Sequence, residues 1–179
     1  ESGDHRPTTE ARIVFSHEGL HLIFRVQDQY VRCVQTALNG PVCTDSCVEF
    51  FVQPLEQKGY LNFELNCGGT LHASYIADPT RTDSGFADCS LLSEADAARV
   101  DIFHSMPSVV EPELRDPTTW VNQIFIPFAL FSNCVGELGP IRGQTWRANF
   151  YKCGDKTSHP HWAAWSPVRE LNFHDPECF

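Results

Sequence analysis

Polar side chains that could bind a ligand alternate with apolar ones in three short segments of the sequence. In YLNFELN (60–66) one half is apolar, and the other half carries hydroxyl, amide and carboxylate groups; SCVEFF (46–51) and TWRANFY (145–151) have the same arrangement. The groups that would share one sheet face form what we call the polar row: Glu49, Asn62, Glu64, Asn66, Arg147, Asn149 and Tyr151. Such groups can pair with the hydroxyls of a polar ligand or with one another in an internal network, and the sequence leaves both interpretations open.

Four tryptophans supply candidate stacking surfaces. Trp120 and Trp146 begin strand-like segments, where core positions are expected. Trp162 and Trp165 lie among Pro, Ser and His in HPHWAAWSP, which is more typical of a loop. Because sugars combine flat C–H faces with rims of hydroxyls, loop tryptophans beside a polar row suit a saccharide better than most ligands.

Cysteine and histidine spacings give weaker indications of metal binding. Cys43 and Cys47 have a C-x3-C spacing, but no second close Cys/His pair completes a zinc-ribbon pattern. His159 and His161 could form a ligand pair, although a proline separates them. The pairing of the eight cysteines stays open, and we expect those within strands to be small buried hydrophobic residues: Cys47, Cys67 and Cys153.

Catalysis has little support in the sequence. Glu49 and Glu64, on adjacent strands, could form the two-carboxylate arrangement of glycosidases, but Arg147 beside them would hold a carboxyl ionised. No GxSxG, HExxH, P-loop or Rossmann fingerprint is present. A haem-binding alternative would need an axial His or Met, and no spacing singles out His72, His104 or a tail histidine for that role. The sequence therefore predicts a chain that is not an enzyme and has no cofactor.

The elements that must position these residues are mostly strands. Residues 91–99 could be a short helix or a loop, 107–117 are expected to be irregular, and 127–131 indicate a helical turn that starts at a proline. Alternation and turn boundaries predict strands at 11–17, 20–28, 46–54, 60–66, 69–77, 120–128 and 145–153. We predict an all-β fold, a two-sheet antiparallel β-sandwich with short helical turns, as a single domain over residues 1–179.

Charge and hydropathy exclude some partners. The net charge is −10 and no cluster of Lys and Arg occurs, which argues against nucleic acid or an anionic membrane as the main partner. No run of eighteen apolar residues is present, so we expect no membrane insertion. The chain starts at Glu1 and enters a strand pattern within a dozen residues, which indicates a processed or truncated chain whose missing signal peptide says nothing about location.

Six motifs in order resemble the carbohydrate-binding module family 9-like domains, within the broader DOMON-like group of β-sandwiches. They are DSCVEFF, YLNFELNCGGTL, IPF, RANFYKCGD, HPHWAAWSP and NFHDPECF, and they span roughly residues 45–179. The sequence departs from the pattern at Asp175, where a basic residue is commoner, and it ends before the usual final glycine and strand. The resemblance implies a jelly-roll-like sandwich that is truncated at its termini.

The resemblance also implies a ligand and a site. Relatives hold sugar rings between tryptophans, with amide and charged side chains on the hydroxyls, and some are attached to glycan-degrading enzymes. If these roles apply to the present sequence, Trp162 and Trp165 would stack on a mono- or oligosaccharide, and the polar row would bind its hydroxyls. A secreted, periplasmic or cell-surface location follows from glycan capture. Some relatives bind structural calcium. The alternatives are a haem-binding DOMON-type domain and a structural or interaction module with no sugar ligand.

Overall fold

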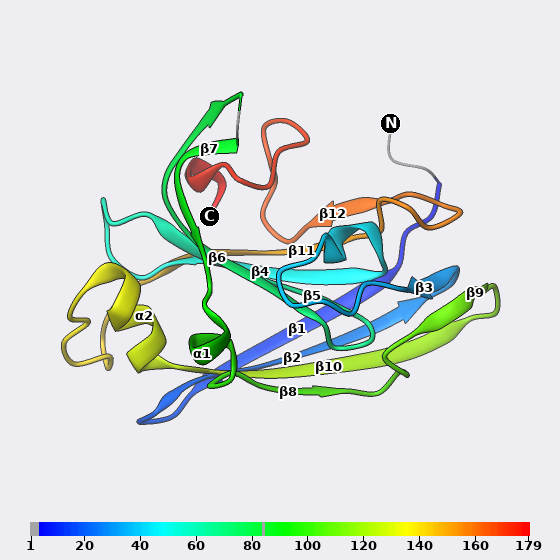
Figure 1. Cartoon of the computed structure of the whole chain (residues 1–179), viewed down its shortest axis with the longest axis horizontal. Helices are drawn as coiled ribbons and strands as arrows, with labels where there is room; N and C mark the ends of the chain where they lie inside the picture. Colours follow the sequence, from blue (N-terminus) through cyan, green and yellow to red (C-terminus); the bar gives the residue numbers. More distant parts are fainter. Residues whose placement is uncertain (1–3, 84) are drawn as a thin grey trace.

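Two antiparallel sheets pack face to face in the computed structural model, which describes residues 4–83 and 85–179 (Figure 1). The four-stranded sheet has the order β1 (Thr8–Phe15), β2 (Gly19–Asp28), β10 (Thr118–Pro127) and β8 (Asp101–His104). The six-stranded sheet has the order β12 (Trp162–Ala164), β11 (Arg147–Cys153), β4 (Cys47–Gln53), β5 (Tyr60–Asn66), β6 (Leu71–Thr82) and β7 (Gly85–Leu91). A small ribbon pairs β3 (Val31–Cys33) with β9 (Val110–Leu114). The predicted antiparallel β-sandwich is confirmed.

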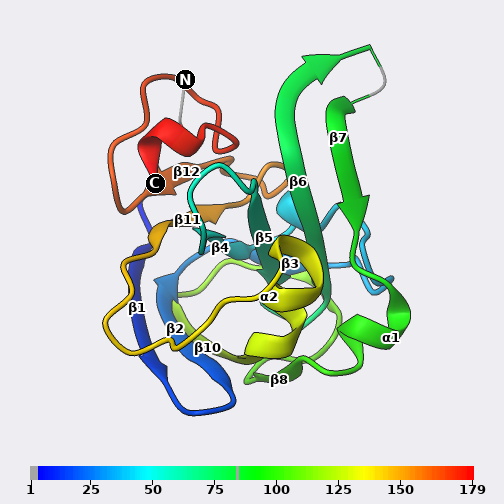
Figure 2. The same ribbon diagram turned by 90° about the vertical axis from the view of Figure 1, so that its left-hand side faces the viewer.

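Within residues 4–83 and 85–179, helices are few and short. They are α1 (Glu94–Ala97), α2 (Phe128–Val135) and the 3-10 turns η1 (Val42–Thr44) and η2 (Pro176–Cys178). Helix α2 follows Pro127, as the sequence predicts, and covers one end of the sandwich (Figure 2). Across the described part of the chain, no helix has the length and apolar character needed to cross a bilayer.

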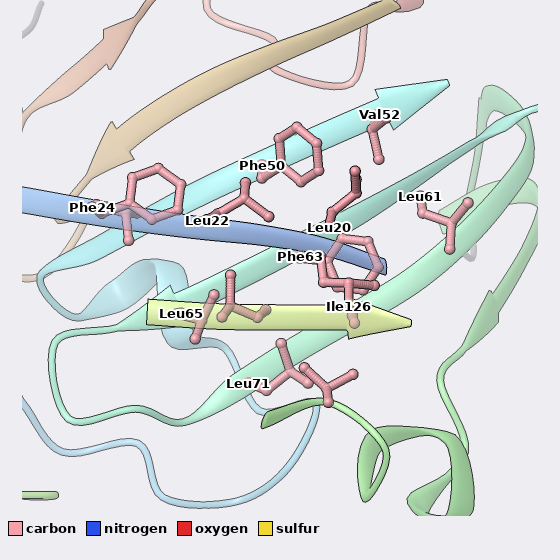
Figure 3. Packing of buried hydrophobic residues seen from close by; sticks show 14 of the residues in the cluster. Leu20, Leu22, Phe24, Phe50, Val52, Leu61, Phe63, Leu65, Leu71 and Ile126 are labelled. Atoms are coloured by element: carbon pink, nitrogen blue, oxygen red, sulfur yellow. The ribbon is translucent and has the colours of Figure 1, made fainter. Parts of the chain in front are cut away.

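The main core lies between the two sheets. Along strands β2, β4 and β5, successive side chains point to opposite faces of the sheet. Every second side chain therefore points into the core, as Figure 3 shows for Leu22, Phe50 and Phe63. Trp120 on β10 is fully buried, in agreement with its expected core position. The apolar halves of the three segments singled out in the sequence therefore form the sandwich interior, and their polar halves lie on the outer face of the six-stranded sheet.

Some elements escaped sequence analysis. The strand predicted at 69–77 was expected to end at residue 77. Instead, β6 continues to Thr82 and pairs with β7 (Gly85–Leu91). Residues 107–117, expected to be irregular, contain β9, and the short strands β8 and β12 were not predicted. Backbone pairing with a neighbouring strand stabilises these segments as strands. Their side chains have little apolar periodicity from which a strand could be predicted.

A tight turn through Cys67, Gly68 and Gly69 joins β5 to β6. Gly69 has a φ of 84°, a region that glycine adopts at low cost, and a Cβ there would meet His104 at 2.4 Å. The Gly69 amide donates to the Asn66 carbonyl at 3.0 Å, and the Asn66 side chain accepts from the Thr70 amide at 2.9 Å. The turn fixes the pairing of β5 with β6 and thereby the place of the outer-face residues.

The C-terminal segment, residues 168–179, crosses the outer face of the six-stranded sheet beside β6 and β7 (Figure 1). Phe173 and Phe179 from this segment pack on a second apolar cluster that includes Phe51, Tyr60 and Tyr151. Strands β4 and β5 are consequently buried on both faces. The polar row is not an open surface.

A buried ion pair joins the two sheets. Lys152 on β11 lies between the layers, with its Nζ 3.3 Å from Asp28 Oδ2 of β2 and 2.6 Å from His161 Nε2. His5 Nε2 is 2.8 Å from Asp28 Oδ1. Although burial alone would raise the pKa of Asp28, the Lys152 ammonium and the His5 hydrogen bond hold it below its usual value. The side chains of Asp28 and Lys152 are almost inaccessible to solvent, so each charge is stabilised by the opposite charge of the other and not by water.

Asp28→Asn should lower the free energy of unfolding by about 3–5 kcal/mol, because it leaves a buried ammonium without its counter-charge. Denaturant unfolding at pH 7 measures this loss. Glu10→Gln is the matched control, since it removes only the surface pair of Glu10 with Arg25 and should cost less than about 1 kcal/mol. Equal losses in the two variants would contradict the role assigned to the buried pair.

Candidate functional site

A cavity of about 300 Å³ lies on the outer face of the six-stranded sheet, under the C-terminal segment. Its floor is formed by Glu49 of β4, Glu64 of β5 and Cys153 of β11. The C-terminal segment contributes residues 171–174 as a cover, and the remaining lining residues form the walls: Cys43, Arg81, Asp155 and Trp162. The cavity therefore joins the predicted polar row to the His- and Trp-rich end of the chain.

The two floor carboxyl groups face the same cavity from adjacent strands. Glu49 and Glu64 are direct cross-strand partners, as expected from the sequence. Asn62 Nδ2 donates to Glu64 Oε1 at 2.7 Å, and the Asn62 oxygen accepts from the amide of Ser74 at 2.9 Å. Burial raises the pKa of both carboxyl groups, and for Glu49 the neighbouring Glu64 raises it further. Asn62 thus orients Glu64, and the two carboxyl groups can present oxygen atoms to a ligand.

Trp162 forms one wall of the cavity. Its indole Nε1 donates to Asp155 Oδ1 at 2.8 Å, which fixes the ring, and the side chain remains partly exposed. Asp155 is held in turn because its amide donates to the Cys43 carbonyl at 3.0 Å. An aromatic face beside a carboxylate is a suitable surface for a ligand that has both apolar and hydroxylated sides.

The two tyrosines of the polar face hold the cover in place. Phe173 stacks on Tyr151, with ring centroids 4.1 Å apart, and the Tyr151 hydroxyl donates to the Phe173 carbonyl at 3.1 Å. Tyr60 Oη lies 2.8 Å from His174 Nδ1. Burial raises the pKa of both phenols, so they remain protonated donors. Tyr151 therefore lies beneath the cover and is not among the residues that line the cavity.

Two of the predicted site asparagines have their side chains engaged by protein. Asn149 accepts from the Ser166 amide at 2.9 Å and donates to the carbonyls of Ser166 and Cys178, both at 3.1 Å. Asn66 donates to the Gln35 carbonyl at 2.8 Å and to Asp45 Oδ2 at 2.9 Å. Asn149 anchors both ends of the chain that crosses the sheet, and Asn66 joins the β5–β6 turn to the loop after β3.

Arg147 and Trp165 lie outside the cavity. Arg147 is exposed and lies opposite Gln53, four residues along β11 from Tyr151. The expectation that Arg147 lies beside the two glutamates is therefore wrong. Trp165 has 74% of its surface exposed and packs edge-on against Phe150, in a separate groove near β1. Of the two loop tryptophans, the structure brings only Trp162 to the floor carboxylates.

Several lining residues were not singled out from the sequence. Arg81 lies beyond the predicted strand at 69–77, and only the extension of β6 brings it to the cavity. His174 was considered only as a tail histidine for metal or haem. Asp155 and Phe173 fall within the motifs RANFYKCGD and NFHDPECF, which carry the family resemblance. That signal could have identified them.

Asn66→Ala should destabilise the whole domain by about 2–3 kcal/mol, because it leaves buried partners of the amide unpaired. Thermal or denaturant unfolding checks this. Asn133→Ala, at an exposed position on α2, should change stability by less than about 0.5 kcal/mol. An Asn66→Ala protein as stable as the Asn133→Ala protein would contradict the assigned anchoring role.

Acid should loosen the cover through His174. Burial, with the nearby charge of Arg81, lowers the pKa of His174 to about 3. Between about pH 6.5 and 3 the unfolded segment binds a proton that the folded one does not, so stability falls as pH falls, by up to about 1.4 kcal/mol per pH unit. Hydrogen exchange of the C-terminal segment at several pH values measures this dependence.

His174→Gln removes this titration and should flatten the pH dependence of exchange in the segment. His17→Gln is the control, because His17 lies in the exposed β1–β2 turn. His161, whose pKa is lowered to about 4 by burial and by the Lys152 ammonium, has the same sign and is retained in both variants. Identical slopes in the two variants would show that His174 does not govern the cover.

Comparison with known proteins shows the family and the fold. A candidate carbohydrate-binding protein from Bacteroides uniformis is 31% identical, with a TM-score of 0.82 over 98% of this chain and 77% of that one. A carbohydrate-binding module of family 9 from Caldicellulosiruptor kristjanssonii, solved in complex with glucose, has the same fold at 11% identity, with a TM-score of 0.59 over 99% of this chain and 76% of the other. No curated protein gives a match. The model of carbohydrate-binding family 9 matches residues 1–179, and the chain belongs to that family.

Proposed function

We propose that the chain is a non-catalytic domain that binds a mono- or oligosaccharide in the cavity above Glu49 and Glu64. The observation that carries the proposal is the meeting of two buried carboxyl groups and the ring of Trp162 around one cavity. At about 300 Å³, the cavity is at the small end of ligand pockets, which suits one or two sugar units.

The lining provides the two kinds of contact that a sugar needs. Trp162 and Phe173 offer apolar faces for the C–H side of a ring. Glu64, Glu49 and Asp155 can accept hydrogen bonds from hydroxyl groups, and Arg81 can donate a hydrogen bond to a hydroxyl or ring oxygen. Because three carboxyl groups face one guanidinium among the described lining residues, a neutral sugar is favoured over a uronic acid.

The arrangement supports binding in preference to hydrolysis. Glycosidases place their two carboxyl groups on either side of the scissile bond. Here both carboxyl groups project from neighbouring strands of one floor, so a sugar would rest on them from a single side. A domain of this kind holds a glycan for another protein or domain to process, which favours a location outside the cytoplasm.

The described relatives support the ligand class. The family to which the chain belongs is carbohydrate-binding, and the Caldicellulosiruptor kristjanssonii module of the same fold was solved with glucose. Glucose is therefore the first probe, followed by neutral oligosaccharides and a uronic acid.

Calorimetric titration with this set of sugars tests the proposal on wild-type protein and two variants. Trp162→Ala should weaken binding about tenfold or more, because the loss of a stacking face of roughly 1.4 kcal/mol corresponds to a factor of ten. Trp165→Ala is the matched control and should bind as wild type, since Trp165 lies in a different groove.

Two outcomes would overturn the proposal. One is the absence of binding by wild type across neutral and acidic sugars. The other is an equal loss of sugar affinity in Trp162→Ala and Trp165→Ala, which would show that the sugar does not bind in the cavity. Near-UV circular dichroism of each variant separates a lost contact from a lost fold.

A further inference from the structure

Two cysteines and a glutamate converge at the floor of the cavity. Cys47 on β4 and Cys153 on β11 are direct cross-strand partners, and Glu49 lies two residues further along β4 on the same face. One ligand atom from each residue lies within 4.8 Å of the other two, and Cys153 Sγ is 2.9 Å from Glu49 Oε1. All three residues are buried. The sheet itself imposes this proximity, because it places the three side chains on one face of two paired strands.

The spacing of these atoms matches that of ligands around one small divalent ion. Two metal–sulfur bonds of about 2.3 Å can span no more than about 4.6 Å, and a metal–oxygen bond is about 2.0–2.2 Å long. The three atoms lie within 4.8 Å of one another, which is close to the span that one ion can bridge. Two thiolates and one carboxylate select a soft or borderline ion such as Zn²⁺ or Cd²⁺, whereas Ca²⁺ takes oxygen ligands.

The surroundings of the cluster favour a cation. Glu49 and Cys153 both line the cavity, so a fourth position on a bound ion would face the cavity and could take water. Asp155 and Glu64 lie around the same space, with Arg81 as the cationic side chain among the described lining residues. Buried acidic groups must be protonated or paired with positive charge, and a divalent ion supplies that charge.

We propose that Cys47, Cys153 and Glu49 form a binding site for a thiophilic divalent cation of the zinc type at the cavity floor. On binding, the two thiols, and the Glu49 carboxyl group if it is protonated, lose their protons to the buffer. Two metal–sulfur bonds and one metal–oxygen bond form, and no atom changes oxidation state. In the metal-free protein the Cys153 thiol donates to Glu49, and the ion takes the place of that proton. The site does not depend on the binding of sugar.

A titration of the reduced protein with Cd²⁺ tests the proposal, because cadmium–thiolate bonds give an ultraviolet charge-transfer band that counts the sulfur ligands. Wild type should bind about one ion per chain through two thiolates, and native mass spectrometry with Zn²⁺ should show the same stoichiometry. Cys153→Ser and Glu49→Gln should each weaken binding about 10- to 100-fold or more, since even the loss of a group that only supports a ligand has an effect of that size.

Control variants separate this site from other thiols and from the proposed sugar site. Cys89→Ser, at an exposed cysteine on β7, should bind Cd²⁺ as wild type does. Trp162→Ala should also retain the metal while losing sugar, so the two proposals can fail separately. Circular dichroism confirms folding, and the near-isosteric Glu49→Gln serves if a cysteine variant unfolds.

Three results would overturn the site. They are a wild-type protein that takes up no stoichiometric Cd²⁺ or Zn²⁺ after reduction, undiminished affinity in both Cys153→Ser and Glu49→Gln, and a charge-transfer band that survives in Cys153→Ser but disappears in Cys89→Ser.

Discussion

The cavity exists because one polar side chain ties a non-repetitive segment to a sheet. Asn149 uses both ends of its amide to hold the backbone at Ser166 and Cys178, so the chain between these points must pass over the outer face. Tyr151 and Tyr60 then fix Phe173 and His174 from below. With β4 and β5 covered on both sides, the carboxyl groups of Glu49 and Glu64 are removed from bulk water. The raised pKa values, the enclosed floor and the aromatic walls all follow from that covering.

The polar row therefore divides into two kinds of residue that look alike in the sequence. Asn66, Asn149 and Tyr151 have partners within the protein and hold loops in place. Glu49 and Glu64 face the cavity and keep oxygen atoms available to a ligand. Asn62 belongs to both groups, because it binds Ser74 of β6 while it orients Glu64. Of the two interpretations that the sequence left open, the internal network is observed at Asn66, Asn149 and Tyr151, and the ligand site is the one proposed at Glu49 and Glu64.

The sequence predicted the sandwich and its central strands, because a period of two in SCVEFF, YLNFELN and TWRANFY directly reflects burial on one side. It could not predict which polar residues line the cavity. That depends on where residues 168–179 cross the sheet, and this segment has no periodicity. Arg147 and Trp165 were placed at the site by strand and loop membership alone, whereas the register puts Arg147 opposite Gln53 and Trp165 against Phe150. The proximity of Cys47 to Cys153 is likewise a matter of register, and the local Cys43–Cys47 spacing gave no indication of it.

Alternation within β5 also bears on how such a domain can diverge. Leu61, Phe63 and Leu65 serve the interior, and Asn62 and Glu64 serve the outer face, within the same seven residues. Substitutions at the second set can change what the cavity accepts while the packing that maintains the fold is untouched. Copies of this gene could thus acquire new ligands by single steps at alternate codons, and a designer could change specificity by the same route. Asn62 and Asn66 are the exceptions, because the Asn62 side chain binds Ser74 of β6 and the Asn66 side chain secures the neighbouring loops.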